Sequence, residues 1–353
     1  MAPLRVVLYE NPHPSPAAHR PPMPPTKSPA TLRDVAELAG VSTAAVSKFV
    51  NGKQRFTAAV ERRIAEAIDQ VGYRSNLAAR SMVTGRSGAI AALVYGVENP
   101  YTAAVIKGAS RAATALGYDL LFVDLLQSES PERELARVTG MQVDGIVLAA
   151  ALPAEARQLL ASYGRPFVDL NRASEPSQAP SGEEQAAAML GRYLLSLGHR
   201  DIAYIACEAQ PGNADRLQGM QRSLQAAGVA LTVHPVSSPT AEEGARVASS
   251  LLLGQKRPQA IATCNDLIAM GLMSEARHLG LSVPEDVSVA GIENMPFGRF
   301  LSPPLTSVDL HADALGEWAM RDLIATIDGE DAPVRGHDLT PRLIVRGSTR
   351  AAG

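Results

Sequence analysis

Residues 31–52 read TLRDVAELAGVSTAAVSKFVNG, and this stretch decides the fold of the N-terminal part of the chain. Thr31 can cap a helix whose third residue, Asp34, completes a capping box, and Gly40 supplies the stop. Ser42 can cap a second helix only two residues later. Two short helices joined by so tight a turn predict a helix-turn-helix.

The apolar residues of these helices recur at helical spacing, which predicts their buried faces. The expected inward residues are Val35, Leu38 and Ala39 in the first helix and Val46, Phe49 and Val50 in the second. A third helix starting at Thr57 adds Ile64, Ile68 and Val71 to the same core. The spacing leaves five side chains of the second helix outward: Thr43, Ala44, Ser47, Lys48 and Asn51. A second helix exposed in this way has the geometry that enters a DNA major groove.

The charge of the chain is unevenly distributed. Residues 31–86 carry nine Lys or Arg against five Asp or Glu, a net charge of +4, and residues 1–30 carry +2. Since the whole chain has a net charge of −3, the remainder carries −9. Positive charge on a small module attached to an acidic body indicates a polyanion partner for that module. Solvated surfaces also carry such a charge, so this feature alone decides nothing.

From residue 89 onward, short apolar runs alternate with longer amphipathic segments. Buried parallel strands give such runs, and the intervening segments are long enough for crossover helices, so the sequence predicts an α/β chain wound in two halves. The runs are Ile90 to Tyr95, Tyr118 to Asp124, Gly145 to Ala149, Pro166 to Leu170, Ile202 to Ala206, Ile261 to Thr263 and Val287 to Ala290. Many enzymes share this pattern, so function must come from sites.

Length and composition narrow the class of protein. A chain of 353 residues with 46% hydrophobic content predicts two or three domains. The apolar run from Leu4 to Leu8 soon meets Glu10, which fits neither a signal peptide nor a membrane span, so we expect a cytoplasmic protein without a membrane partner. Cys207 and Cys264 lack metal-ligand spacing, and we expect both to be buried and unpaired, with no metal or cofactor.

Long segments of the sequence resemble the lactose and galactose repressor (LacI/GalR) family. Residues 31–52 follow the DNA-binding pattern of that family, and GYRSNLAARSMVTGRS at 72–87 follows its hinge. The resemblance continues through VENPYTAAVIKGASRAATALGYDLLFVD, VDGIVLA, LGHRDIAYI, ADRLQGM, PPLTSV and LIVRGST. It implies a small all-α helix-turn-helix domain and hinge helix, followed by a core that is like a periplasmic sugar-binding protein, with two parallel-sheet subdomains.

The domain boundaries follow from this resemblance. We expect a Pro-rich, disordered tail at 1–30, because it contains nine prolines and little apolar periodicity. The DNA-binding domain is expected at 31–75, the hinge at 76–85 and the effector-binding and dimerisation core at 86–353. Crossovers near Ser177, Val308 and Val334 divide the core into an N-subdomain, about 86–177 and 309–334, and a C-subdomain, about 178–308 and 335–350.

The resemblance also assigns roles in DNA binding. It implies that Thr43, Ala44 and Lys48 read base edges. It implies that a larger group contacts phosphates or orients the helix: Thr31, Ser42, Ser47, Asn51, Thr57, Tyr73 and Asn76. Hydroxyls and backbone amides at helix starts do bind phosphate, whereas side chains in the groove determine sequence. Lys48 stands where many relatives carry Arg, and Lys lacks the planar fork that discriminates guanine best.

A hinge helix at Asn76 to Met82 is too short to be stable in isolation and should fold only on DNA. The resemblance implies that paired hinge helices, including Ala79, enter the minor groove of a pseudo-palindromic operator. Met82 occupies the wedge position that is usually Leu, and an apolar Met can still unstack bases. The alternative role for Met82 is packing against protein.

The expected effector site lies between the two core subdomains. The candidate residues are Tyr95, Asn99, Tyr101, Asn171, Arg216, Asn265 and Glu293. Arg216 matches the pocket arginine of the family, although an interdomain ion pair is an alternative role. Asn171 and Glu293 depart from residues that are usual in relatives, so the effector, a sugar or a related metabolite, cannot be copied from one of them. Trp318 is more typical of a core residue than of a ligand platform.

We consider three classes of protein as hypotheses for this sequence. The leading hypothesis is a homodimeric repressor whose operator affinity is controlled by a small-molecule effector. A solute-binding protein and a sugar-modifying enzyme use a similar α/β core. The first alternative conflicts with the helix-turn-helix. The second lacks a catalytic motif, since GxGxxG, Walker, GxSxG and HExxH patterns are absent and His199 in LGHRD is expected to cap a helix or contact the core.

Overall fold

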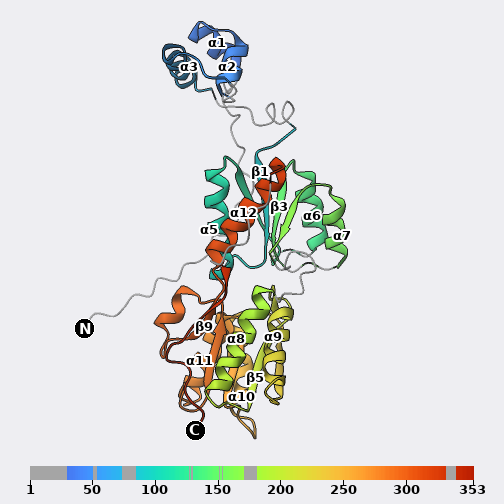
Figure 1. The fold of residues 1–353 in the computed structure, drawn as a ribbon, viewed down its shortest axis with the longest axis vertical. Helices are drawn as coiled ribbons and strands as arrows, with labels where there is room; N and C mark the ends of the chain where they lie inside the picture. Colours follow the sequence, from blue (N-terminus) through green and yellow to red (C-terminus); the bar gives the residue numbers. More distant parts are fainter. Residues whose placement is uncertain are drawn as a thin grey trace, which may run out of the picture. The chain divides into compact units, whose positions relative to one another are not determined.

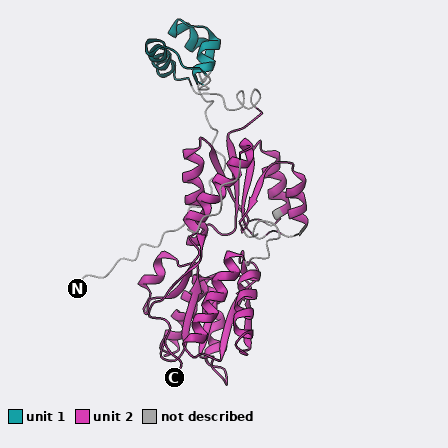
Figure 2. Cartoon of the chain, viewed as in Figure 1, with its two compact units in different colours: residues 1–76 teal, residues 77–353 magenta. Residues whose placement is uncertain are grey.

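The computed structural model describes residues 30–50, 54–73, 85–170 apart from 127, 129, 151 and 153, 181–330, and 339–353. The chain forms two compact units, residues 1–76 and 77–353, which Figure 2 shows in separate colours. The predicted hinge helix, Asn51 and Asn171 lie outside the described residues, as do the crossover positions Ser177 and Val334.

The first unit contains three helices, α1 (Leu32–Ala39), α2 (Thr43–Val50) and α3 (Ala58–Val71). Thr31 and Asp34 form the predicted capping box of α1, and Gly40 ends the helix in the left-handed conformation, φ 63°. The helices enclose an apolar cluster built around six buried residues: Val35, Ala36, Ala39, Val46, Ile64 and Ala67. The prediction that Leu38 is buried is wrong, because 51% of this residue is exposed.

The second unit contains two parallel sheets with helices on their faces (Figure 1). The first sheet has the order β2-β1-β3-β4 and the second has the order β10-β9-β8-β7-β5-β6, in which only β10 is antiparallel to its neighbour. The strands of the first sheet are β1 (Ala89–Val94), β2 (Asp119–Asp124), β3 (Gly145–Ala149) and β4 (Phe167–Asp169). Those of the second are β5 (Ile202–Cys207), β6 (Leu231–Val236), β7 (Ala260–Thr263), β8 (Ser288–Ile292), β9 (Thr306–Asp309) and β10 (Arg342–Ile344). The predicted α/β fold is confirmed, and each predicted run overlaps a strand.

The helices of this unit are α5 (Pro100–Ala115), α6 (Pro131–Gly140), α7 (Ala154–Ser162), α8 (Gly182–Ser196), α9 (Asn213–Gln225), α10 (Ala241–Leu252), α11 (Asp266–His278), the 3-10 helix η1 (Pro296–Phe300) and α12 (Ala312–Asp328). Helix α12 follows β9 in sequence but packs against α5 beside the first sheet, as Figure 1 shows. The chain therefore crosses between the two sheets after β9. Trp318 of α12 is half-buried against the core of the first sheet, as predicted.

Three helix pairs pack with their backbones unusually close, because glycines lie at the contact. In the pair α5 and α12, a Cβ on Gly108 would lie 1.8 Å from the backbone oxygen of Asp313. In the pair α10 and α11, a Cβ on Gly271 would lie 1.7 Å from the oxygen of Ala241. The pair α8 and α9 uses Gly219 in the same way. These contacts fix the helices whose first turns surround the cavity described below.

Candidate nucleic-acid interface and ligand cavity

Helix α2 presents an exposed face on the three-helix unit. Thr43, Ala44 and Lys48 are exposed along this face, while Val46 on the opposite side is fully buried. The hydroxyl of Ser42 accepts a hydrogen bond from the backbone amide of Ala45 at 3.1 Å and thereby caps the helix. The helix is thus anchored by its apolar side and leaves its polar side available for a partner.

The two threonines at the helix starts differ in what their hydroxyls do. The Thr31 hydroxyl donates to Asp34 at 2.8 Å, and the backbone amide of Thr31 donates to the same carboxylate at 2.7 Å, which lowers the pKa of Asp34. Thr57 precedes α3 but makes no side-chain cap hydrogen bond. Its exposed hydroxyl is therefore available to bind a phosphate at a helix N-terminus.

The other residues predicted to contact DNA differ in their exposure, and some of them lie outside the described residues. Ser47 and Tyr73 are half-buried, and Tyr73 packs against the apolar cluster of the three helices. Asn51, Asn76, Ala79 and Met82 lie outside the described residues. The exposed basic side chains of the described part of this unit are Arg33, Lys48, Arg55, Arg62 and Arg63.

A cavity of about 280 Å³ lies where the carboxyl ends of strands from both sheets face each other. Ligands of α/β proteins bind in this kind of place, because loops and helix starts converge there. The first sheet and its helices contribute residues that include Tyr95, Asn99, Tyr101 and Leu315. The second contributes residues that include Glu183, Gln210, Pro211, Ser238, Leu267 and Met270.

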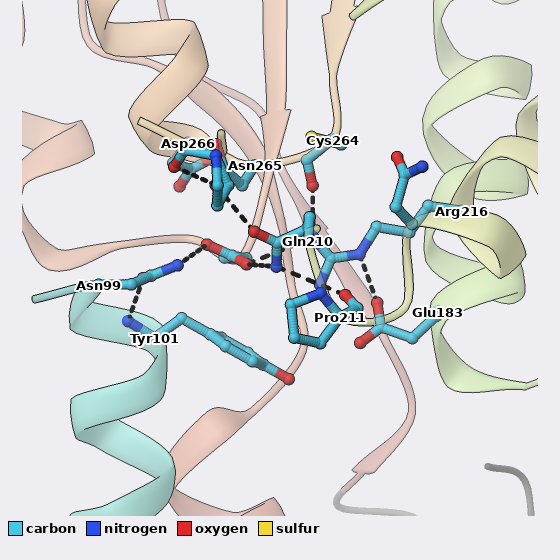
Figure 3. Close-up of polar contacts among 12 residues, drawn as sticks. Asn99, Tyr101, Glu183, Gln210, Pro211, Arg216, Cys264, Asn265 and Asp266 are labelled. Carbon is cyan, nitrogen blue, oxygen red and sulfur yellow. Dashed lines mark hydrogen bonds and ion pairs between the residues drawn. The ribbon is translucent and has the colours of Figure 1, made fainter. Parts of the chain in front are cut away.

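A network of buried polar groups lies behind this cavity (Figure 3). Arg216 is completely buried, and its Nε donates to Glu183 at 2.6 Å. Its Nη1 donates to the backbone oxygen of Cys264 and to Glu293, the latter at 3.3 Å. Both carboxylates come from the same lobe as Arg216, so the structure does not give Arg216 the interdomain ion pair that was the alternative from sequence.

Glu293 connects this network to the other lobe. Its carboxylate accepts from Gln210 at 3.0 Å and from the Asn99 side chain, at the start of α5, at 3.4 Å. Burial raises the pKa of Glu293 to about 8, although the Arg216 guanidinium acts in the opposite direction. Its backbone has φ 111°, a strained conformation for a residue with a side chain. Asn99 and Glu293 thus form a direct polar link between the two lobes.

Asn265 has a structural role in this state. Its side-chain oxygen accepts from the amide of Ile268 at 2.9 Å and caps α11, while its Nδ2 donates to Gln210 and to the oxygen of Pro239, each at 3.0 Å. Of the predicted effector residues, Tyr95, Asn99 and Tyr101 line the cavity. Arg216, Asn265 and Glu293 lie behind its wall, and Glu293 also lines a neighbouring cavity of about 340 Å³.

Sequence reasoning missed Glu183 and Gln210, which complete the network. Glu183 lies in the first turn of α8, where an acidic residue follows the cap Ser181, and Gln210 lies in the loop between β5 and α9. The sequence marks them only by their positions, Glu183 after a helix cap and Gln210 after the end of a strand, and many surface residues occupy such positions. His199, by contrast, contacts the core as predicted, since it is 2% exposed and its Nε2 lies 3.0 Å from the oxygen of Arg350.

The cysteines and the acidic side chains offer no metal site in the described part of the chain. Cys207 and Cys264 are buried and unpaired, which confirms that prediction. Among the described residues, no group of three His, Cys, Asp or Glu side chains is placed to hold a metal ion. No described helix has the length and apolar character needed to cross a membrane.

Comparison with known proteins places both units. Residues 31–76 match the family "Bacterial regulatory proteins, lacI family", and residues 192–349 match "Periplasmic binding protein-like domain". The chain is 31% identical to the HTH-type transcriptional repressor PurR of Vibrio vulnificus over 91% of this chain and 99% of that protein. It is 33% identical to the HTH-type transcriptional regulator MalR of Streptomyces coelicolor over 91% of this chain and 97% of that protein.

Solved structures give the same fold. A lac repressor dimer bound to operator and the anti-inducer ONPF has a TM-score of 0.80 and 22% identity, covering 92% of this chain and all of that one. A complex of the transcriptional regulator CelR with cellobiose has a TM-score of 0.63 and 27% identity, covering 90% of this chain and 99% of that one. The second likeness extends over both the DNA-binding and the cavity-bearing parts.

Proposed function

This chain belongs to the lacI family of bacterial regulatory proteins, and from that premise we propose that it is a transcriptional repressor whose operator affinity is controlled by a small molecule. The observation that carries the proposal is the exposed face of α2. Ser42 caps the helix and Val46 anchors it, so Thr43, Ala44 and Lys48 project from a fixed helix. A fixed helix with a polar exposed face is what major-groove recognition requires.

The proposed roles in DNA binding follow the chemistry of each side chain. Lys48 donates to guanine, Ala44 makes apolar contact with a thymine methyl, and Thr43 contacts base edges. The remaining sequence-predicted residues position the unit on phosphates: Thr31, Ser42, Ser47, Asn51, Thr57, Tyr73 and Asn76. Residues 76–85 form the hinge, in which Ala79 and Met82 enter the minor groove. Residues 86–353 bind the effector and dimerise, with the two subdomains divided near residues 177, 308 and 334.

The cavity is the proposed effector site. A ligand there contacts both lobes, and its binding competes with or reinforces the link between Asn99 and Glu293. Closing or opening the lobes then changes whether two hinges fold together on DNA, and the coupling can have either sign. PurR, MalR and the lac repressor are themselves named as regulators. We propose the same regulatory role for this protein. It acts as a cytoplasmic homodimer and catalyses no reaction.

The Lys48→Ala variant tests this function on duplexes selected from a random pool by the intact protein. Loss of one base contact should weaken binding to the selected duplex about 5- to 150-fold and weaken binding to a scrambled duplex much less. The control is Arg192→Ala, which removes an exposed charge from α8 in the other unit. If gel shifts show that Lys48→Ala loses the same affinity for both duplexes, α2 is not the element that reads the DNA sequence.

A further inference from the structure

Gln210 lies between the ligand cavity and the polar network behind its wall (Figure 3). It lines the cavity, whereas its partners Asn265 and Glu293 do not, and only 4% of it is exposed. Its Nε2 donates to Oε1 of Glu293 at 3.0 Å, and its Oε1 accepts from Nδ2 of Asn265 at 3.0 Å. The carboxamide of Gln210 therefore covers one acceptor and one donor that a ligand in the cavity would otherwise meet.

The guanidinium of Arg216 lies close to this carboxamide. Nη1 of Arg216 and Nε2 of Gln210 donate to the same oxygen, Oε1 of Glu293. Nε and Nη1 of Arg216 are both used, but its Nη2 is fully buried and has no hydrogen-bond partner among the described residues. A buried donor without an acceptor is unfavourable. The network thus holds one donor that Gln210 does not satisfy.

The charge of Arg216 is already balanced within the protein. Glu183 lies 2.6 Å from its Nε, and Glu293 lies 3.3 Å from its Nη1. The charged groups that line the cavity are all acidic among the described residues: Glu98, Glu183 and Glu242. An anionic ligand would meet this negative charge with no described cation on the cavity wall to offset it. The acceptor that suits Nη2 is therefore a neutral one, such as a carbonyl oxygen.

Most neutral polar side chains on the cavity wall are also engaged within the protein. The side chain of Asn99 accepts from the amide of Tyr101 at 2.8 Å and donates to Glu293. The hydroxyl of Thr102 donates to the backbone oxygen of Tyr95 at 3.3 Å. A ligand with many hydroxyl groups would lose hydrogen bonds to water that this wall does not replace.

Much of the remaining cavity wall is apolar. Helices and strand ends of both lobes supply its side chains: Val105, Leu126, Leu170, Leu267, Met270 and Leu315. A volume of about 280 Å³ with such walls suits a ligand whose body is a small apolar ring system.

We propose that the effector is an apolar ring molecule with an amide edge, N–H beside C=O as in a lactam, which replaces the carboxamide of Gln210. This inference rests on the proposed function, since it names the ligand class of the same cavity. The N–H of the ligand donates to Glu293, and its carbonyl oxygen accepts from Asn265, as the carboxamide does now. The second lone pair of the carbonyl oxygen accepts from Nη2 of Arg216. This additional hydrogen bond favours the ligand over Gln210.

The test uses three sets of matched probes on the full-length protein. Each set keeps one ring skeleton and varies the polar group: oxindole, 2-indanone, 2-indanol, 2-aminoindane and indane-2-carboxylate; 3,4-dihydroquinolin-2-one, 2-tetralone, 2-tetralol, 2-aminotetralin and tetralin-2-carboxylate; 2-piperidone, cyclohexanone, cyclohexanol, cyclohexylamine and cyclohexanecarboxylate. Glucose represents polyhydroxylated ligands. Calorimetry measures binding without DNA, and gel shift measures the change in operator affinity.

In at least one set, the lactam should bind about fivefold or more tightly than each of its four matched probes. The ketone lacks the N–H that Glu293 accepts, and the alcohol cannot replace both halves of the carboxamide. The amine lacks the acceptor that Nη2 of Arg216 needs, and the carboxylate adds negative charge to an acidic cavity.

Two variants locate the amide edge. Gln210→Ala removes the competing carboxamide and should tighten lactam binding about threefold or more. Arg216→Lys keeps a positive charge beside Glu183 but lacks Nη2, so it should weaken lactam binding about three- to tenfold. Gln225→Ala and Arg192→Lys, at exposed positions that do not line the cavity, are the matched controls and should leave the affinity unchanged. If Arg216→Lys does not fold by circular dichroism, Gln210→Ala and the probe ranking still decide.

An absence of binding by every lactam would overturn the inference, as would lactams that bind no more tightly than their matched probes, tighter binding of glucose, or a lactam affinity that Gln210→Ala leaves unchanged. These results leave the proposed function intact if the protein still selects an operator. Failure to select any DNA sequence would instead contradict the proposed function, and the calorimetric ranking of the probes would still decide the ligand class.

Discussion

Glu293 lies beside the proposed effector cavity and also affects the stability of the fold. It is buried, has a strained backbone and touches Arg216, Gln210 and Asn99. The carboxyl groups of Asp266 and Glu183 also act on it, and both raise its pKa. The charged form of Glu293 is therefore unfavourable in the folded protein. Its protonated form persists to a higher pH there than in an unfolded chain.

Glu293→Gln should reduce the pH dependence of stability. Since burial raises the pKa from 4.5 to about 8, the stabilising contribution of the protonated group is complete below pH 4.5 and is lost as pH rises through 8. As the pH rises from 4.5 to 8, the thermal unfolding midpoint of the native protein should therefore fall more than that of the variant.

Glu285→Gln, at an exposed position, provides the control and should run parallel to the native protein. Asp266, whose pKa burial raises to about 7, is present in every protein compared, so the difference between the native protein and Glu293→Gln reports Glu293 together with its coupling to Asp266. Parallel curves for the native protein and Glu293→Gln would contradict the pKa shift.

At the residue scale, the sequence predicted which positions line the cavity better than it predicted which side chains contact one another. Tyr95, Asn99 and Tyr101 line the cavity because they follow a strand end, which an apolar run marks clearly. The enclosure of Arg216 by two carboxylates depends on residues 33 and 77 positions away, and no local pattern encodes such pairs. Leu38 lies at helical spacing yet is exposed, because the cluster of three short helices is too small to cover it.

At the element scale, the strands with continuous apolar sequence were predictable, and three others were not. Strand β6 reads LTVHPV, lies at the edge of its sheet and is only partly buried, so no apolar run marks it. Strand β9 reads TSVD, and its Thr306 and Ser307 are buried through hydrogen bonds with side chains distant in sequence. Strand β10 spans only three residues. Tertiary contacts, not propensity, define these elements.

The close helix pairs give a prediction at the same scale. Gly271→Ala should destabilise the second unit by about 1–3 kcal/mol, because the added Cβ would meet the backbone oxygen of Ala241 and force α10 and α11 apart. Gly182→Ala is the control, since a Cβ on this first residue of α8 would meet no neighbouring atom within 4 Å. Urea unfolding followed by far-ultraviolet circular dichroism, which reports the helices of both lobes, measures both. Equal stabilities would show that the helices separate at little cost.

At the scale of the whole molecule, the proposed switch joins two units with different tasks. The first unit presents α2, and the second encloses a cavity between two lobes. The sequence predicted this division through long family motifs, while the ligand could not be read from them. The acidic, apolar character of the cavity depends on side chains from separate strand ends and helix starts, which only the fold brings together.

The hinge supplies a prediction for the whole switch. We expect Met82→Gly to weaken binding to a selected operator more than binding to random DNA, because removing the apolar wedge abolishes contacts made only with a bent, specific site. Electrophoretic titrations of both duplexes measure the two losses, and Met82→Leu should restore most of the specific affinity. A Met82→Gly protein that loses both affinities to the same extent would exclude the wedge role.

The central claim is that two copies of α2 read a symmetric DNA site. The most direct test is the affinity of the intact protein for a selected two-fold symmetric duplex, for one half of that duplex and for a scrambled duplex at one salt concentration. The account predicts that the symmetric duplex binds at least about 10³-fold more tightly than the scrambled one and that the half-site loses most of this advantage. Equal affinities for the symmetric and scrambled duplexes would contradict it.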